Sequence, residues 1–490
     1  MKLNNSIKKY LNYCTLILVA GVVSCADNYL EVDSYGAPVL ENFYKTPLDA
    51  EQALNAAYSP MREMYGVENF WGVMGTDIIF GDIGTDDFIK GGNRLVDNLP
   101  LYQKETYDIP TSNIAIEQIW KVNYKGILYA NLILEKVPSI EFTNANRKKE
   151  IIAEAHFLRA YYFFDLVNTF GGVPLVDKVL AAGEYNIPRS TKSEIYAFIE
   201  AELQKTIADL PSRFSKDLSY LGHADKGAAI GLMMRVSLYQ NKMGQVKTYG
   251  EQLFLIPQYE LVEYKTIFEP EGEWNSGSIF EINFSSNTSV LGTGITQRIS
   301  PKSKKGGGFM QAKEGLRNEF EPNDPRYLAT FYNVSGGYGT GWYVKKYSWA
   351  PFSNNPSPTI GGNNNSANNI RVIRLADAYL MYAEAIYNID PVTSVKYVNK
   401  VRTRARGAQP LTVVPDLPET LNGQALLDAI YHERRVELAG EGFRYQDLLR
   451  TNRVDAILVP LGFVKGKHEV MPIPYSQVTL SKGILKQNNY

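Results

Sequence analysis

Apolar residues recur at helical spacing along much of the chain. Within residues 117–137 they stand three to five positions apart, at Ile119, Val122, Ile127, Ala130 and Leu134. This is the spacing of the buried face of an amphipathic helix. The same criterion predicts helices over residues 148–167, 224–241, 245–255, 371–388, 394–406 and 424–439. The chain is therefore expected to be mainly helical.

One helix start is marked by local chemistry as well as by periodicity. Thr191-Lys192-Ser193-Glu194 is a capping-box sequence, in which the Thr and Glu side chains bond the first free backbone N–H groups. Apolar residues then continue at helical spacing, and Pro211 follows them. The pattern predicts a helix that begins at this box and ends before the proline.

Two of the predicted helix pairs resemble each other. Leu232, Met233, Tyr239 and Tyr249 recur 148 residues later as Leu380, Met381, Tyr387 and Tyr397. Each set covers a helix, a short break and a second helix, which is the layout of a tetratricopeptide-type hairpin. Coincidence among amphipathic helices is the alternative. We predict an all-α fold built on stacked helix pairs.

The segment 256–370 between these pairs has a different character. Residues 277–285 alternate, with Ile282 and Phe284 opposed to Glu281 and Asn283, and predict a strand. Glycine clusters and an Asn-rich run at 354–369 predict loops. Three of the five Trp, at 274, 342 and 349, fall in this segment. We predict a loop-rich insert with short strands, of the kind in which binding residues concentrate.

The first 25 residues have the pattern of a targeting segment. Lys2, Lys8 and Lys9 precede a mostly apolar run over 11–23, which is too short to span a bilayer. The run ends in Val22-Val23-Ser24-Cys25, which resembles a bacterial lipobox, in which the Cys receives a lipid. Ordinary signal cleavage beside an unrelated Cys is the alternative. We predict a signal peptide over 1–24 and a lipid on Cys25.

Charge and cysteine content narrow the function classes. The 51 basic and 52 acidic residues give no global field for nucleic acid or anionic membrane. Both cysteines lie in the first 25 residues, so the remaining chain has neither a disulfide framework nor a Cys-based metal site. The 33 Tyr are typical of surfaces that bind sugars or proteins, because Tyr combines a flat apolar ring with a polar tip.

Catalytic and cofactor motifs are absent. The four His are far apart in sequence, and Val436 stands where a zincin motif beginning at His432-Glu433 needs its second His. The sequence contains neither a nucleophile elbow nor a phosphate loop. We predict no metal and no cofactor. A glycosidase carboxylate pair stays open, because its two acids can be distant in sequence.

The strongest local cluster of charges begins at Glu433. Glu433 and Glu437 fall on one helical face beside alternating arginines, and Arg444 follows a Gly-rich turn. Paired carboxylates can carry out acid–base catalysis, but alternating opposite charges suit ion pairing better. We therefore predict that Glu433, Arg435, Glu437 and Arg444 form a structural charge network.

Several blocks of the sequence resemble the SusD/RagB family, the surface lipoproteins of Bacteroidota nutrient uptake. These blocks are Ile151-Ile152-Ala153-Glu154-Ala155-His156-Phe157-Leu158-Arg159-Ala160-Tyr161-Tyr162, Phe170-Gly171-Gly172-Val173-Pro174-Leu175, Arg374-Leu375-Ala376-Asp377-Ala378-Tyr379-Leu380, the cluster from Glu433 to Arg450, and Met471-Pro472-Ile473-Pro474. The resemblance extends from Asn28 to Tyr490. The ending departs from the family pattern, since Ser481-Lys482 replaces the usual Asn-Pro.

The resemblance implies a scaffold of about four tetratricopeptide-type helix pairs, with an N-terminal region over 25–220 and a C-terminal region over 221–490. It implies a lipoprotein anchored only by its lipid to the outer membrane, facing the cell exterior. Such proteins cover a SusC-like TonB-dependent transporter as a lid and capture a nutrient, here expected to be a glycan. They are binding proteins, not enzymes. A peptide or glycoprotein ligand, and a surface-anchored glycoside hydrolase, are the alternatives.

Ligand capture by such a protein needs exposed aromatic rings beside polar groups. Sugar rings present apolar C–H faces to Trp and Tyr, while their hydroxyls bond Asn, Arg and Asp. Trp342 and Trp349 are the first candidates, followed by Trp274 and then Tyr102. Packing in the core is the alternative for each, and alternation from Tyr343 to Trp349 equally fits a strand face.

Overall fold

A computed structural model describes residues 43–66, 76–287, 291–304, 306–335, 338–347 and 366–490. Contacts divide the chain into residues 1–45 and 46–490, and every described helix and strand lies in the second unit. Cys25 and Trp349 lie outside the described residues. The predicted boundary between residues 220 and 221 stays a prediction.

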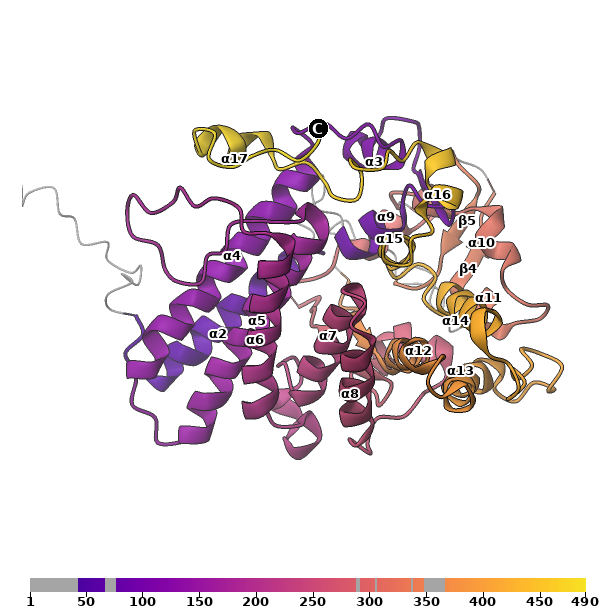
Figure 1. Cartoon of the computed structure of the whole chain (residues 1–490), viewed down its shortest axis with the longest axis horizontal. Helices are drawn as coiled ribbons and strands as arrows, with labels where there is room; N and C mark the ends of the chain where they lie inside the picture. Colours follow the sequence, from indigo (N-terminus) through magenta and orange to yellow (C-terminus); the bar gives the residue numbers. More distant parts are fainter. Residues whose placement is uncertain (1–42, 67–75, 288–290, 305, 336–337, 348–365) are drawn as a thin grey trace, which may run out of the picture. The chain divides into compact units, whose positions relative to one another are not determined.

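Helices make up most of the second unit, and the fold is all-α with a tetratricopeptide-like arrangement (Figure 1). The longer helices are α2 (Pro47–Glu63), α4 (Ile114–Lys136), α5 (Ala145–Phe170), α6 (Lys192–Asp209), α7 (Lys226–Tyr239), α8 (Met243–Phe254), α12 (Leu375–Ile386), α13 (Pro391–Arg406) and α14 (Gly423–Glu437). The shorter helices are α3 (Leu99–Glu105), α9 (Ile295–Ile299), α10 (Glu314–Asn318), α11 (Pro325–Thr330), α15 (Arg444–Arg450), α16 (Val454–Ile457) and α17 (Tyr475–Leu480).

Neighbours in this series pack side by side. Helix α4 packs on α2 and α5, α5 on α6, and α6 on α7, while α7–α8 and α12–α13 form two hairpins joined by contacts between α8 and α12 (Figure 1). These hairpins are the two repeats predicted from the sequence. Buried residues from α12, α13 and α14, including Leu380, Val398 and Ile430, form one continuous core cluster.

The capping box is present as expected. The Glu194 N–H donates to the Thr191 hydroxyl at 3.2 Å, and the Thr191 N–H donates to the Glu194 carboxylate at 2.7 Å. Helix α6 therefore begins at Lys192, directly after its cap. A second capping box, Thr46 with Asp49, starts α2 and was not predicted from the sequence.

In the described residues, two small sheets lie between the helices. Strands β1 (Phe88–Gly91), β3 (Phe309–Ala312), β5 (Trp342–Val344) and β4 (Phe331–Asn333) form an antiparallel sheet in that order. Strands β2 (Ser278–Ile282) and β6 (Ile370–Arg374) form a two-stranded ribbon. Strand β2 is the one predicted from alternation, and both it and β5 lie in the predicted insert.

The predicted helix over 371–388 is wrong at its start. Residues Ile370–Arg374 form β6, and α12 begins only at Leu375. All five side chains of β6 are buried, and the strand pairs with β2. Pairing satisfies the backbone of this β-branched stretch, so tertiary context overrides the helical spacing.

Candidate functional site

The structure places the three described aromatic candidates in separate surroundings. Trp342 begins β5, where its ring lies edge-on to Tyr327 at 5.9 Å and beneath the Arg317 guanidinium at 4.4 Å. Tyr102 is on α3. Trp274 lies just before β2 and lines a groove. Neither Trp342 nor Tyr102 lines that groove, so the candidates do not form one surface among the described residues.

This groove, called the Trp274 groove below, consists of two adjoining compartments. The His223 compartment has a volume of about 230 Å³ and is lined by α2, residues 221–223 and residues 280–283. The Trp274 compartment has a volume of about 430 Å³ and is lined by Glu273, Trp274, residues 283–285 and Asn369. Arg62, Leu221 and Asn283 line both compartments. Together the compartments have the size of a small-molecule site.

Trp274 has a strained backbone that its neighbours hold in place. Its φ angle is 53°, a left-handed conformation that bulky residues rarely adopt. Its backbone N–H donates to the buried Glu281 carboxylate at 2.8 Å, and its indole N–H donates to the Asn283 side chain at 2.8 Å. Such strain costs roughly 1–3 kcal/mol and persists where the surroundings enforce it, often at binding sites.

Polar side chains beside Trp274 form a connected network. The Asn369 amide donates to Glu281 at 3.0 Å and to Asn283 at 3.1 Å. Gly222 approaches so closely that a Cβ at this position would lie 2.2 Å from the Asn283 amide nitrogen. The network therefore fixes the orientation of both Asn283 and Trp274.

Two carboxylates of the groove differ in their availability. Glu281 is fully buried, and its oxygens accept from Trp274 and Asn369, with Arg371 at 3.6 Å. Glu273 is partly exposed, and burial raises the pKa of its carboxyl to about 7, although the N–H of Asn369 donates to it. Glu281 is too enclosed to touch a ligand, so the two do not form an accessible catalytic pair.

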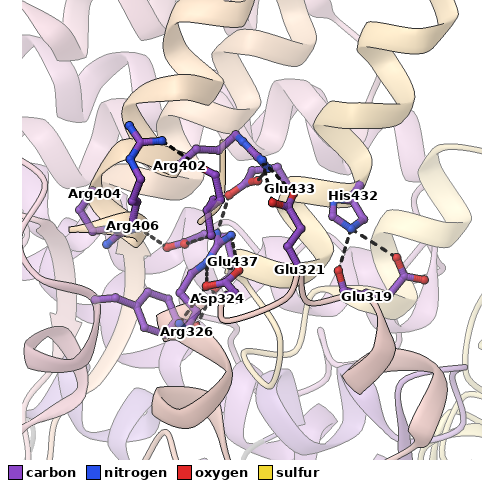
Figure 2. A network of polar contacts seen from close by, with 12 residues as sticks. Glu319, Glu321, Asp324, Arg326, Arg402, Arg404, Arg406, His432, Glu433 and Glu437 are labelled. Carbon is purple, nitrogen blue, oxygen red and sulfur yellow. Dashed lines mark hydrogen bonds and ion pairs between the residues drawn. The ribbon is translucent and has the colours of Figure 1, made fainter. Parts of the chain in front are cut away.

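The charge cluster on α14, called the α14 network below, differs from the groove because its carboxylates are enclosed by arginines (Figure 2). Glu433 and Glu437 share the guanidinium of Arg326, and Asp324 pairs with the same guanidinium at 2.8 Å. Arg402 reaches Glu433 at 2.9 Å, and Arg404 reaches Glu437 at 2.6 Å. The acids around Arg326 and Arg402 come from two segments, Glu321 and Asp324 from the insert and Glu433 and Glu437 from α14.

The neighbouring arginines keep the Glu437 carboxylate ionised. Burial alone would raise the pKa of its carboxyl, but Arg404, Arg374 and Arg326 outweigh burial and lower the pKa to about 2. A carboxylate held ionised by three guanidinium groups is a poor proton donor at neutral pH. The contacts favour the predicted structural role for Glu433 and Glu437, which stays a prediction until the variants below are measured.

Arg435 and Arg444 extend the network to a distant part of the chain. Arg435 pairs with Asp86 at 2.8 Å, with Asp87 at 2.6 Å and with Glu319 at 2.6 Å. Arg444 also pairs with Asp86, at 2.7 Å. These partners lie about 350 positions earlier or in the insert, so no local pattern in the sequence could reveal them.

Sequence reasoning missed most of the groove. Arg62, His223 and Asn369 come from a helix end, a loop and a strand end that converge only in the folded chain. Asn283 was visible as part of a polar strand face, and that face was the one signal that could have found it. No cluster of three His, Cys, Asp or Glu suited to a metal occurs among the described residues.

In the part of the chain that the structure covers, no helix combines the length and apolar character needed to cross a bilayer.

Two family models match successive parts of the chain. One is described as the SusD family and matches residues 264–490, and the other is described as starch-binding associating with outer membrane and matches residues 28–238. A SusD-like protein of Formosa agariphila is 26% identical, over 96% of this chain and 97% of that relative.

Solved structures agree with these matches. A laminarin binding SusD-like protein has a TM-score of 0.80 at 28% identity, and the match covers 91% of this chain and 100% of that one. The surface glycan-binding protein A from Bacteroides thetaiotaomicron in complex with laminarihexaose has a TM-score of 0.77 at 26% identity, with the same coverage. The fold, the two family models and these relatives agree, and the chain belongs to the SusD family.

Proposed function

We propose that this protein binds an oligosaccharide in the Trp274 groove, as a surface protein of a nutrient-uptake system. The observation that carries the proposal is Trp274 itself, an indole held at a strained φ of 53° by Glu281 and Asn283 on the wall of a groove. The names of two structural relatives, which bind laminarin and laminarihexaose, support a carbohydrate as the ligand class.

The chemistry of the groove suits a sugar. An indole offers a flat apolar face to the C–H groups of a pyranose ring. Arg62 and the exposed side-chain amide N–H of Asn283 supply donors for hydroxyl groups along the same wall, while Asn369 is buried and holds Asn283 in place. Because the hydrogen-bond network around Trp274 is already formed in the free protein, little side-chain entropy is lost when the ligand binds.

Binding is expected to be modest. Stacking of a ring on an aromatic side chain contributes about 1–3 kcal/mol, and the groove is open to solvent, so a Kd between roughly micromolar and millimolar follows. Such an affinity suits a protein that must release its cargo to a transporter.

The geometry supports binding rather than hydrolysis. The carboxylates Glu433 and Glu437 are buried in ion pairs, and in the groove Glu281 is enclosed while Glu273 stands without an accessible second acid among the described residues. A glycosidase needs two carboxyl groups on either side of the bond it cleaves.

Affinity electrophoresis against a panel of polysaccharides that includes laminarin tests the proposal. Wild-type protein should be retarded by at least one polymer, and Trp274→Ala should lose several-fold to about a hundredfold in affinity, the range that loss of one stacking contact allows. Trp342→Ala is the matched control, because its ring lies on the four-stranded sheet outside the groove. Equal loss in both variants, or none in Trp274→Ala, would place the site elsewhere.

Anchoring and partnership complete the proposal. A lipid on Cys25 would hold the protein on the outside of the outer membrane, where it would act as the lid of a SusC-like TonB-dependent transporter. Affinity purification of this chain from gently solubilised membranes should recover such a barrel with the wild type. Cys25→Ala should leave the membrane fraction, and recovery of the lipidated chain alone across growth substrates would count against the partnership.

A further inference from the structure

Arg62 is a cation at the junction of the two compartments. It lies in the last turn of α2 and lines both of them. Its neighbour Glu63 pairs instead with Lys125 at 2.8 Å. No acid among the residues that the structure describes forms an ion pair with Arg62, although most arginines of this chain have carboxylate partners. A guanidinium left open in a groove is suited to bind an anion through two parallel hydrogen bonds.

His223 faces the same compartment with one ring nitrogen fixed. Its Nδ1 lies 2.7 Å from the Glu154 carboxylate, which also accepts from the Tyr58 hydroxyl at 2.6 Å. Arg147 pairs with the other oxygen of Glu154 at 3.0 Å and balances its charge. The His223 ring also stacks on Tyr220, with the ring centres 5.1 Å apart.

This arrangement leaves Nε2 of His223 for a ligand. A carboxylate on one ring nitrogen sets the orientation of the imidazole, and the opposite nitrogen then has no hydrogen-bond partner among the described residues. Glu154 is fully buried, so the ligand meets His223 and not the acid behind it.

The remaining charges around the His223 compartment are compensated. Glu281 lines it but bonds Trp274 and Asn369, with Arg371 nearby. Glu273 lines only the Trp274 compartment. Of the described groups, Arg62 is therefore the single charge in the His223 compartment without an internal counterion.

We propose that the His223 compartment binds an anionic sugar residue, with Arg62 on its carboxylate or sulfate group and His223 on a neighbouring hydroxyl. The ligand class is then an acidic glycan, either a uronate or a sulfate ester, whose next ring extends over Trp274. This inference rests on the proposed function and specifies the ligand that the same groove would take.

Matched pairs of polymers test the inference on the folded full-length chain. Polygalacturonate and its methyl ester differ in the carboxylate, and dextran sulfate and dextran differ in the sulfate ester. Wild-type protein should be retarded more by at least one acidic polymer than by its neutral counterpart. Arg62→Gln should lose about tenfold or more in that affinity, as expected for a charged hydrogen-bonded pair. A difference within the polygalacturonate pair would identify the carboxylate as the recognised group, and a difference within the dextran pair would identify the sulfate.

Two further variants separate the site from general charge effects. Arg94→Gln removes the same charge from an exposed position outside the groove and should bind normally. Arg62→Lys keeps the charge but loses the planar fork, and should fall between wild type and Arg62→Gln.

The outcomes are distinct. Equal losses in Arg62→Gln and Arg94→Gln, or preference for neutral polymers with no effect of Arg62→Gln, would overturn the acidic ligand and leave the proposed function standing. If the protein bound none of the acidic polymers, the acidic ligand would be overturned. If it bound no polymer of the wider panel either, both proposals would be overturned.

Discussion

The α14 network and the Trp274 groove are both rich in polar side chains, yet they differ in whether those side chains have charge partners within the protein. Around α14, Arg326 is almost fully buried and contacts Glu433, Glu437 and Asp324. In the groove, Arg62 has no acid partner among the described residues, and Trp274 keeps a strained φ. The number of polar side chains in a region is thus a poor guide to function. Polar side chains without partners inside the protein are a better guide.

The two regions should also differ in how much their residues contribute to the free energy of unfolding. Removing one partner from a buried ion-pair network leaves an uncompensated charge, whereas removing an unpaired groove residue leaves the folded chain nearly unaffected. Stability measurements can therefore separate the two regions without knowledge of the ligand.

Arg326→Met should produce the largest effect. Glu433, Glu437 and Asp324 would all lose their shared cation, and the free energy of unfolding should fall by about 3–5 kcal/mol. Denaturant unfolding measures this, with Arg94→Gln expected to stay within about 0.5 kcal/mol of wild type. If Arg326→Met kept wild-type stability but lost glycan binding, the network would be part of the site instead.

Glu437→Gln should change how stability depends on pH. The folded-state pKa of Glu437 is about 2, below its ordinary value of 4.5. Its contribution is therefore fully present above pH 4.5 and is lost as the pH falls toward 2. The stability deficit of Glu437→Gln relative to wild type should be greatest above pH 4.5 and shrink on acidification. A deficit that stayed constant from pH 6 to pH 3 would contradict the assigned ion pairs.

Trp274→Gly should have the smallest effect on stability. Glycine adopts a positive φ without strain, and this gain offsets the lost contacts of the ring with Phe280 and Arg213. The free energy of unfolding should stay within about 1 kcal/mol of wild type, while polysaccharide binding falls as in Trp274→Ala. A loss comparable to that of Arg326→Met would show that Trp274 is a core residue.

The sequence predicted the helical scaffold well because its signals are local. Apolar spacing marked α4 and α5, the Thr191 capping box marked the start of α6, and alternation marked β2. Residues 371–374 were assigned to a helix because their spacing is equally helical, and only pairing with β2 makes them part of a strand.

The groove could be predicted only in part. Trp274 stood out as an aromatic residue in a loop-rich insert, but Arg62 and His223 look unremarkable in their own segments. Their significance depends on the absence of an acid partner for Arg62 within the described part of the chain and on Glu154 behind His223, and both are properties of the folded chain. The charges of the α14 network were recognised locally, whereas their partners Asp86 and Arg326 were not.

Hydrogen–deuterium exchange on the wild-type protein, with and without the polysaccharide that retards it most, tests the central claim most directly. The account predicts slower amide exchange in residues 55–62, 221–223 and 273–285, which line the Trp274 groove, and unchanged exchange in β4 and β5. Protection confined to Phe331–Asn333 and Trp342–Val344, with none in the groove, would contradict the account and place the ligand on the four-stranded sheet.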